Sequence, residues 1–227
     1  MSAVAGLAAE PTRLMPYFDP AVSPLRMVED IAALSSAEVL DLLTTTNAKL
    51  IATVEALDGA GWCTPAESPL GEVPIRLLAS HALWDSWVHE RDILIPLGIE
   101  PAVFADEVIA GLRYVAALTQ GFAFGAGMEC QGRFGIEATA PDFHCVMTIT
   151  DAVTVRMERP DDSMPVLRGP AVLLTEALST RLPLPADAPP EWHRVLAGLE
   201  YTWDLRNDLE PAGAGDVIVS TVMDGRA

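Results

Sequence analysis

The chain has 227 residues, of which 50% are hydrophobic, and a formal net charge of −18. This composition provides a sizeable core for one large domain or two small ones, while the acidic charge disfavours binding to nucleic acids and to anionic membranes. No apolar run approaches the roughly 18 residues that span a bilayer, and the N-terminus lacks the pattern of a signal peptide, so we expect a cytoplasmic protein.

The N-terminal part of the sequence predicts an extended arm followed by a long helix. Residues 1–34 contain repeated prolines, which leave room only for a short helix near 27–34. Ser35 and Glu38 have the spacing of a capping box, in which the serine caps the first turn and the glutamate reaches back to the cap. Apolar residues at helical spacing continue to Leu57, so we expect the helix to end near that residue.

A loop, two further helices and a group of strands follow in the sequence. Prolines and a glycine interrupt the stretch after Leu57, which predicts a loop. We expect helices over 72–95, with Pro74 tolerated in the first turn, and over 104–120. The apolar spacing then changes from helical to alternating, which predicts antiparallel strands over 128–139, 143–150 and 152–158.

The order of the predicted elements indicates an α+β fold. Helices are expected again over 169–180 and 191–205, after the strands. A helical region followed by strands and helices is typical of α+β proteins, and the boundary between the two regions is expected near 121–127. The predicted division is an N-terminal arm, a helical region, a small α+β region and a flexible tail, over 1–34, 35–122, 123–209 and 210–227.

One face of the second predicted helix concentrates ionisable side chains. Each residue of an α-helix turns by about 100°, so His81, Asp85, His89 and Asp92 fall within an arc of about 80°. Large apolar residues flank this stripe, and ionisable groups among them are costly to bury unless they are paired or bound to a metal. A histidine and an aspartate one turn apart can reach one divalent ion. The alternative is a hydrogen-bonded network that orders a helical bundle.

The remaining histidines and the cysteines are weaker candidates. Cys63, Cys130 and Cys145 are widely spaced, which predicts neither a zinc knuckle nor a disulfide framework. His144 is adjacent to Cys145 on a predicted strand, so the two side chains point to opposite faces and His144 is expected to be structural or exposed. His193 is expected to be exposed in the first turn of a helix.

Residues 84–98, WDSWVHERDILIPLG, resemble the metal-ligand helix of the mycothiol-dependent maleylpyruvate isomerase family, within the wider DinB-like group of helical bundles. The resemblance implies that Asp85 and His89 bind a divalent metal ion, usually zinc, and that Asp92 holds the other nitrogen of the imidazole. It also implies an SCP2-like C-terminal region, to which residues 167–181 are similar, with Arg181 contacting an acidic thiol cofactor or substrate. The alternative for Arg181 is a charge that complements a helix dipole.

The chain departs from this family at its N-terminal end. The family's bundle has an upstream pair of helices whose histidine supplies the third metal ligand, and no histidine precedes His81 here. His81 is the substitute ligand that the sequence offers, although ligands on three successive turns extend over about 12 Å of helix axis. Without the first helices of the bundle, apolar surface stays uncovered, which favours a homodimer or a low stability.

The sequence and its resemblance together favour a metal- and mycothiol-dependent isomerase or thiol transferase that acts on a small electrophilic substrate. The expected metal ligands are His81, Asp85 and His89, and the expected catalytic groups are Asp92 and Arg181. The metal would activate the thiol by stabilising its thiolate. Two alternatives stay open: a metal-binding protein of the same fold without catalysis, and a binder of small apolar ligands that uses the SCP2-like region.

Overall fold

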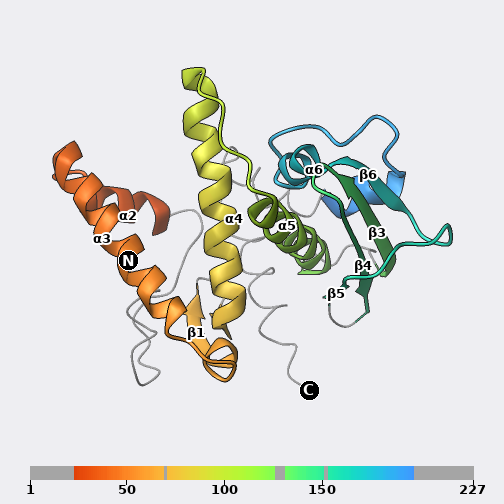
Figure 1. Cartoon of the computed structure of the whole chain (residues 1–227), viewed down its shortest axis with the longest axis horizontal. Coiled ribbons are helices and arrows are strands. Elements are labelled where there is room, and N and C mark those ends of the chain that lie inside the picture. The colour runs from red at the N-terminus through yellow and green to blue at the C-terminus, as the bar shows by residue number, and fades with distance from the viewer. Residues whose placement is uncertain (1–22, 69–70, 126–130, 151–152, 197–227) are drawn as a thin grey trace. The chain divides into compact units, whose positions relative to one another are not determined.

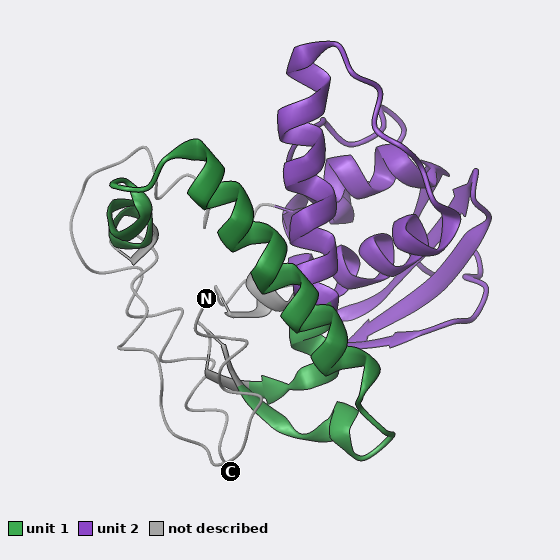
Figure 2. Ribbon diagram, turned by 60° about the vertical axis from the view of Figure 1, so that its left-hand side comes forward, with its two compact units in different colours: residues 1–79 green, residues 80–227 purple. Residues whose placement is uncertain are grey.

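The computed structural model describes residues 23–68, 71–125, 131–150 and 153–196, and the protein is a mixture of helices and sheets, as predicted (Figure 1). The chain divides into two compact units, Met1–Ala79 and Ser80–Ala227 (Figure 2). Most of the expected arm and the whole of the expected tail lie outside the described residues. The expected domain limits remain a prediction.

The first unit contains two helices, α2 (Ser23–Ile31) and α3 (Ser36–Glu55). Helix α3 begins with the predicted capping box. The backbone N–H of Glu38 donates to the Ser35 hydroxyl at 3.3 Å, and the backbone N–H of Ser35 donates to the Glu38 carboxylate at 2.8 Å. These two bonds satisfy donors that a helix start otherwise leaves unpaired. The 3₁₀ turn η1 (Gly61–Cys63) follows.

A short β-hairpin stands where the sequence predicted a loop and the first turn of a helix. Strand β1 (Pro65–Ser68) pairs antiparallel with strand β2 (Gly71–Pro74). Each strand has four residues and a proline at its outer end, so neither is long enough to produce a recognisable alternation of apolar residues. The predicted helix start at 72 is therefore wrong, and α4 (Ile75–Leu94) begins directly after Pro74.

The helical part continues with α4, the 3₁₀ turn η2 (Ile95–Leu97) and α5 (Ala105–Gly125). Gly98 ends η2 with a φ of 72°, a left-handed conformation that glycine adopts without strain. Both long helices were predicted, but α5 runs five residues beyond its expected end at 120.

The second unit contains a four-stranded sheet in the order β5-β4-β3-β6. Three strands form the predicted antiparallel meander, and the fourth, which was not predicted, pairs parallel with β3. The sequence of that strand, VLRGP, is short and contains glycine and proline, and its partner lies far away along the chain, so no local pattern marks it. The strands are β3 (Gly132–Thr139), β4 (Phe143–Ile149), β5 (Val153–Arg156) and β6 (Val166–Pro170).

The core of the second unit lies between this sheet and two helices. Helix α5 contacts β4 and β5, while the predicted helix α6 (Ala171–Leu178) contacts β3, β6 and α5. Alternate residues of β3 and β4 are buried on the core side, which confirms the alternation seen in the sequence: Phe134, Ile136, Ala138, Phe143, Cys145, Met147 and Ile149. Residues 190–196 are helical, and Trp192 is fully buried in the same core. Among the described helices, none is both long and apolar enough to cross a membrane.

Candidate metal-binding site

Within the second unit, α4 exposes the predicted stripe of histidine and aspartate side chains. The side chains of Asp85, His89 and Asp92 are 50%, 60% and 40% exposed, so small solutes can reach them. The same helix is anchored in the core by Trp84, Trp87 and Val88, which are buried on the side next to the stripe. The helix therefore presents the ionisable stripe to solvent from a backbone that packing holds in place.

The imidazole of His89 lies between two carboxylates. Its Nε2 is 3.5 Å from Asp85 Oδ1, and its Nδ1 is 3.1 Å from Asp92 Oδ2. When Nδ1 donates its proton to Asp92, the lone pair of Nε2 points toward the Asp85 carboxylate. Two electron-rich atoms then face each other, which is favourable only with a proton or a metal ion between them.

Arg181 holds Asp92 from the far side. Its Nη2 donates to Asp92 Oδ2 at 3.0 Å, and its Nε is 3.4 Å from Oδ1. These hydrogen bonds lower the pKa of the Asp92 carboxyl, because a guanidinium beside the carboxylate stabilises its charged form. Two N–H groups of this guanidinium are thus directed at Asp92, and Nη1 donates to the Ser179 carbonyl at 2.8 Å.

The end of α6 determines where Arg181 stands. Thr180 has a φ of 62°, the left-handed conformation that often terminates a helix, and the next backbone N–H, that of Arg181, donates to the Glu176 carbonyl at 2.9 Å. Ser179 is fully buried and accepts a hydrogen bond from Trp84 Nε1 at 2.9 Å. The helix end is thereby tied to α4, and it brings a cation to the aspartate at the end of the stripe.

The fourth residue of the stripe, His81, faces a different partner. Its Nδ1 is 2.9 Å from the hydroxyl of Tyr114 on α5, and its ring also contacts the ring of Trp84. Burial lowers the pKa of His81, opposed by the nearby charge of Asp85, so the imidazole is neutral near pH 7. Burial likewise raises the pKa of Tyr114, which keeps the phenol protonated. Only Nε2 of His81 is left to bind a further group.

A buried ion pair that the sequence did not suggest lies behind the stripe. Arg91 and Glu176 are 3% and 7% exposed, and their side chains approach to 3.3 Å. The Arg91 guanidinium stacks over the Trp87 ring at 3.4 Å from its centroid. Burial raises the pKa of Glu176, an effect that Arg91 and then Arg181 oppose. Arg91 is the sequence neighbour of the exposed Asp92, so the sequence alone does not indicate that the Arg91 side chain is buried. Its burial follows from the packing of α6.

The geometry fits a metal ion at two ligands. Two atoms bound at about 2.0–2.1 Å to one tetrahedral zinc ion lie about 3.4 Å apart, and His89 Nε2 and Asp85 Oδ1 are separated by 3.5 Å. Asp92 occupies the position of the carboxylate that typically orients a metal-binding histidine. No set of three or more His, Cys, Asp or Glu side chains in the described ranges is arranged to hold an ion. The structure thus brings together Asp85, His89, Asp92 and Arg181, while His81 is paired with Tyr114.

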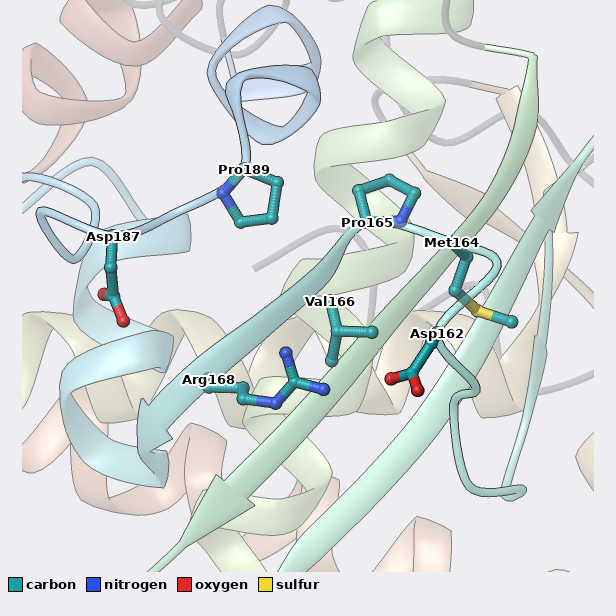
Figure 3. Close-up of a pocket in the computed structure, with 7 residues that line it drawn as sticks. All are labelled: Asp162, Met164, Pro165, Val166, Arg168, Asp187 and Pro189. Atoms are coloured by element: carbon teal, nitrogen blue, oxygen red, sulfur yellow. The ribbon is translucent and has the colours of Figure 1, made fainter.

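A separate hollow lies at the edge of the sheet, beside β6 (Figure 3). Its volume is about 240 Å³. The side chain of Arg168 in this hollow is 2.9 Å from Glu137. The lining residues include no histidine or cysteine and none of the stripe residues, and they are Asp162, Met164, Pro165, Val166, Arg168, Asp187 and Pro189.

Comparisons of the chain with protein-family models, with curated proteins and with solved structures found no match.

Proposed function

We propose that the chain binds a divalent metal ion, zinc by preference, through Asp85 and His89 on α4. The observation that carries this proposal is the arrangement of the His89 imidazole, whose Nε2 faces Asp85 Oδ1 at 3.5 Å while Asp92 takes Nδ1 at 3.1 Å. An imidazole nitrogen and a carboxylate oxygen are common zinc ligands. The net charge of −18 further favours the approach of a divalent cation.

Asp92 and Arg181 support these ligands without binding the ion themselves. Asp92 selects the tautomer of His89 that leaves Nε2 free of a proton, and Arg181 keeps Asp92 ionised and oriented through contacts of 3.0 and 3.4 Å. His81 is the candidate third ligand through Nε2, which stays free when Tyr114 takes Nδ1. A solvent molecule or a thiolate would supply the remaining ligand.

We further propose, from the resemblance to the mycothiol-dependent maleylpyruvate isomerase family, that the bound metal serves a thiol-dependent isomerase or transferase. When bound, the metal stabilises a thiolate at neutral pH. The chain's own residues position the reactants: the exposed stripe gives mycothiol and a small electrophile access to the ligands, and the N–H groups of Arg181 not directed at Asp92 or Ser179 can bind a carboxylate. Such a cofactor requires a reducing compartment, which fits a cytoplasmic enzyme.

A second candidate is a metal-binding protein without catalysis. It is favoured by the exposure of the two ligands, 60% for His89 and 50% for Asp85, which leaves little shelter from water for a reaction. Both candidates require the same metal site, so the first experiment concerns the metal and the second concerns turnover.

The first test is elemental analysis of the untagged protein together with three variants. We expect the wild type to carry a stoichiometric metal ion, His89→Ala and Asp85→Ala to lose it, and His193→Ala to retain it, because His193 is exposed outside the stripe. Both proteins are also dialysed against a zinc solution and their zinc content is measured. If the wild type then holds as little zinc as His89→Ala, the stripe is a hydrogen-bonded network and the proposal is wrong.

The second test measures consumption of electrophiles by the metal-loaded protein with and without mycothiol. Activity that requires the thiol and disappears in His89→Ala supports the enzyme. A metal-loaded protein that shows no thiol-dependent turnover across a panel of electrophiles, maleylpyruvate included, refutes the enzyme and leaves the metal-binding protein.

A further inference from the structure

Helix α3 carries large apolar side chains that are exposed to solvent. None of its 20 residues is buried, and Leu40, Leu43 and Ile51 are 63%, 56% and 57% exposed. In proteins, most of the stability of a helix comes from the packing of its apolar face rather than from helix propensity. Exposed large aliphatic side chains grouped on one helix therefore indicate a contact surface.

The apolar residues of α3 follow the spacing of a coiled coil. Leu40, Leu43, Asn47, Leu50 and Val54 recur at alternating intervals of three and four residues, which are the a and d positions of a heptad repeat. The a positions are Leu40, Asn47 and Val54, and both d positions are leucine. Leucine at d with a β-branched residue at a favours two parallel strands, a preference that Val54 follows and Leu40 does not, and a single asparagine at a specifies register and oligomer state.

The distribution of charge favours a second copy of this chain as the partner that packs against this face of α3. The chain is strongly acidic, yet residues 42–54 contain no acidic residue and only one basic residue, Lys49. The positions that flank the a and d residues are uncharged as well: Val39, Thr44, Thr46, Ile51 and Thr53. Two copies with a net charge of −18 each repel one another over most of their surfaces, and this face is one that they can bring together without like charges meeting.

We propose that α3 pairs with α3 of a second copy in a parallel, two-stranded coiled coil, with Asn47 opposite its counterpart. In a parallel pair the two amides meet at the same level and hydrogen-bond to each other. In an antiparallel pair each a residue faces a d residue, so Asn47 would face a leucine and lose that partner. The dimer places two metal-binding chains in one assembly, and it does not depend on whether they bind metal.

The mass of the protein in solution tests the dimer. We expect sedimentation or light scattering of the full chain to give twice the mass of one chain, falling toward one chain on dilution because the seam spans only two heptads. Leu43→Glu should be monomeric at concentrations where the wild type is dimeric. Ala52→Glu, which adds the same charge on the outer side of α3, should stay dimeric, and circular dichroism checks that both variants fold.

A wild type that is monomeric throughout the dilution series overturns the proposal, and so does a Leu43→Glu variant that is as dimeric as Ala52→Glu. The strand direction is tested by Asn47→Cys in a background with Cys63→Ser and Cys130→Ser. A parallel pair predicts an oxidised, disulfide-linked dimer for Asn47→Cys and none for Thr45→Cys on the outer side. A dimer that Leu43→Glu disrupts but Asn47→Cys fails to cross-link would refute the parallel arrangement.

Discussion

Replacement of Asp92 by asparagine should separate the metal site from the stability of the fold. The variant keeps the shape of the side chain but has one acceptor oxygen and one donor group. In the wild type, His89 Nδ1 and Arg181 Nη2 both approach Oδ2, at 3.1 and 3.0 Å, and Arg181 Nε approaches Oδ1 at 3.4 Å. The amide oxygen of asparagine can occupy only one of the two oxygen positions, so its N–H₂ group must face a donor: Arg181 Nε if the oxygen stands at Oδ2, or both His89 Nδ1 and Arg181 Nη2 if it stands at Oδ1.

The expected magnitudes differ between the two properties. Loss of the carboxylate that orients a metal-binding histidine typically weakens metal affinity by about 10- to 100-fold, which corresponds to about 1.4–2.7 kcal/mol. The stability of the metal-free protein should change little, by about 0.2–1 kcal/mol, because Asp92 and Arg181 are 40% and 24% exposed and solvent screens their attraction.

The measurement is competition for zinc with a chromophoric chelator, together with thermal unfolding in the presence of EDTA. Glu90→Gln is the control, because Glu90 lies on the same helix outside the stripe and its side chain is 46% exposed. Zinc affinity of Asp92→Asn within about twofold of the wild type would refute the role assigned to Asp92. Unfolding of the metal-free variant would show instead that Asp92 is needed for the fold.

Two further predictions concern the core of the second unit. In the native protein at pH 8, a thiol-alkylating reagent should label the exposed Cys63 and leave Cys145 unmodified, because burial raises the pKa of the Cys145 thiol to about 12; labelling of both at equal rates would contradict its burial. Trp84→Phe should cost about 1–3 kcal/mol in urea unfolding, because it removes the donor to the buried Ser179 hydroxyl. Trp87→Phe should lose no such bond, since Trp87 Nε1 has no hydrogen-bond partner among the described residues.

The sequence predicted elements whose signals are local. Ser35 and Glu38 lie three residues apart and cap the helix that they introduce, so neither depends on the rest of the fold. The strands β3, β4 and β5 were predicted because alternating residues face the core and each strand pairs with its neighbour along the chain. Strand β6 joins β3 in parallel from outside this meander, and nothing within VLRGP indicates that pairing.

The candidate site likewise has a part that the sequence predicted and a part that it did not. Asp85, His89 and Asp92 lie on one helix, so the helical period alone places them together. The partners Tyr114 and Glu176 come from α5 and α6, and their contacts with α4 follow from tertiary packing that no spacing in the sequence reveals. Arg181 was selected as a group that binds the carboxylate of a cofactor or substrate, whereas in the structure the carboxylate beside it is that of Asp92.

The pairing of Arg181 with Asp92 fixes the orientation of the His89 imidazole. A histidine that is 60% exposed on a helix surface would be free to change rotamer if only Asp85 faced it. The end of α6 prevents that freedom: the Glu176 carbonyl holds the backbone of Arg181, Arg181 holds Asp92, and Asp92 holds Nδ1 of the His89 imidazole. The orientation of His89 Nε2 is thus determined from a second helix whose own end is buried against α4 through Ser179 and Trp84. The proposed metal site would therefore be preorganised, and preorganisation favours tight binding by few ligands.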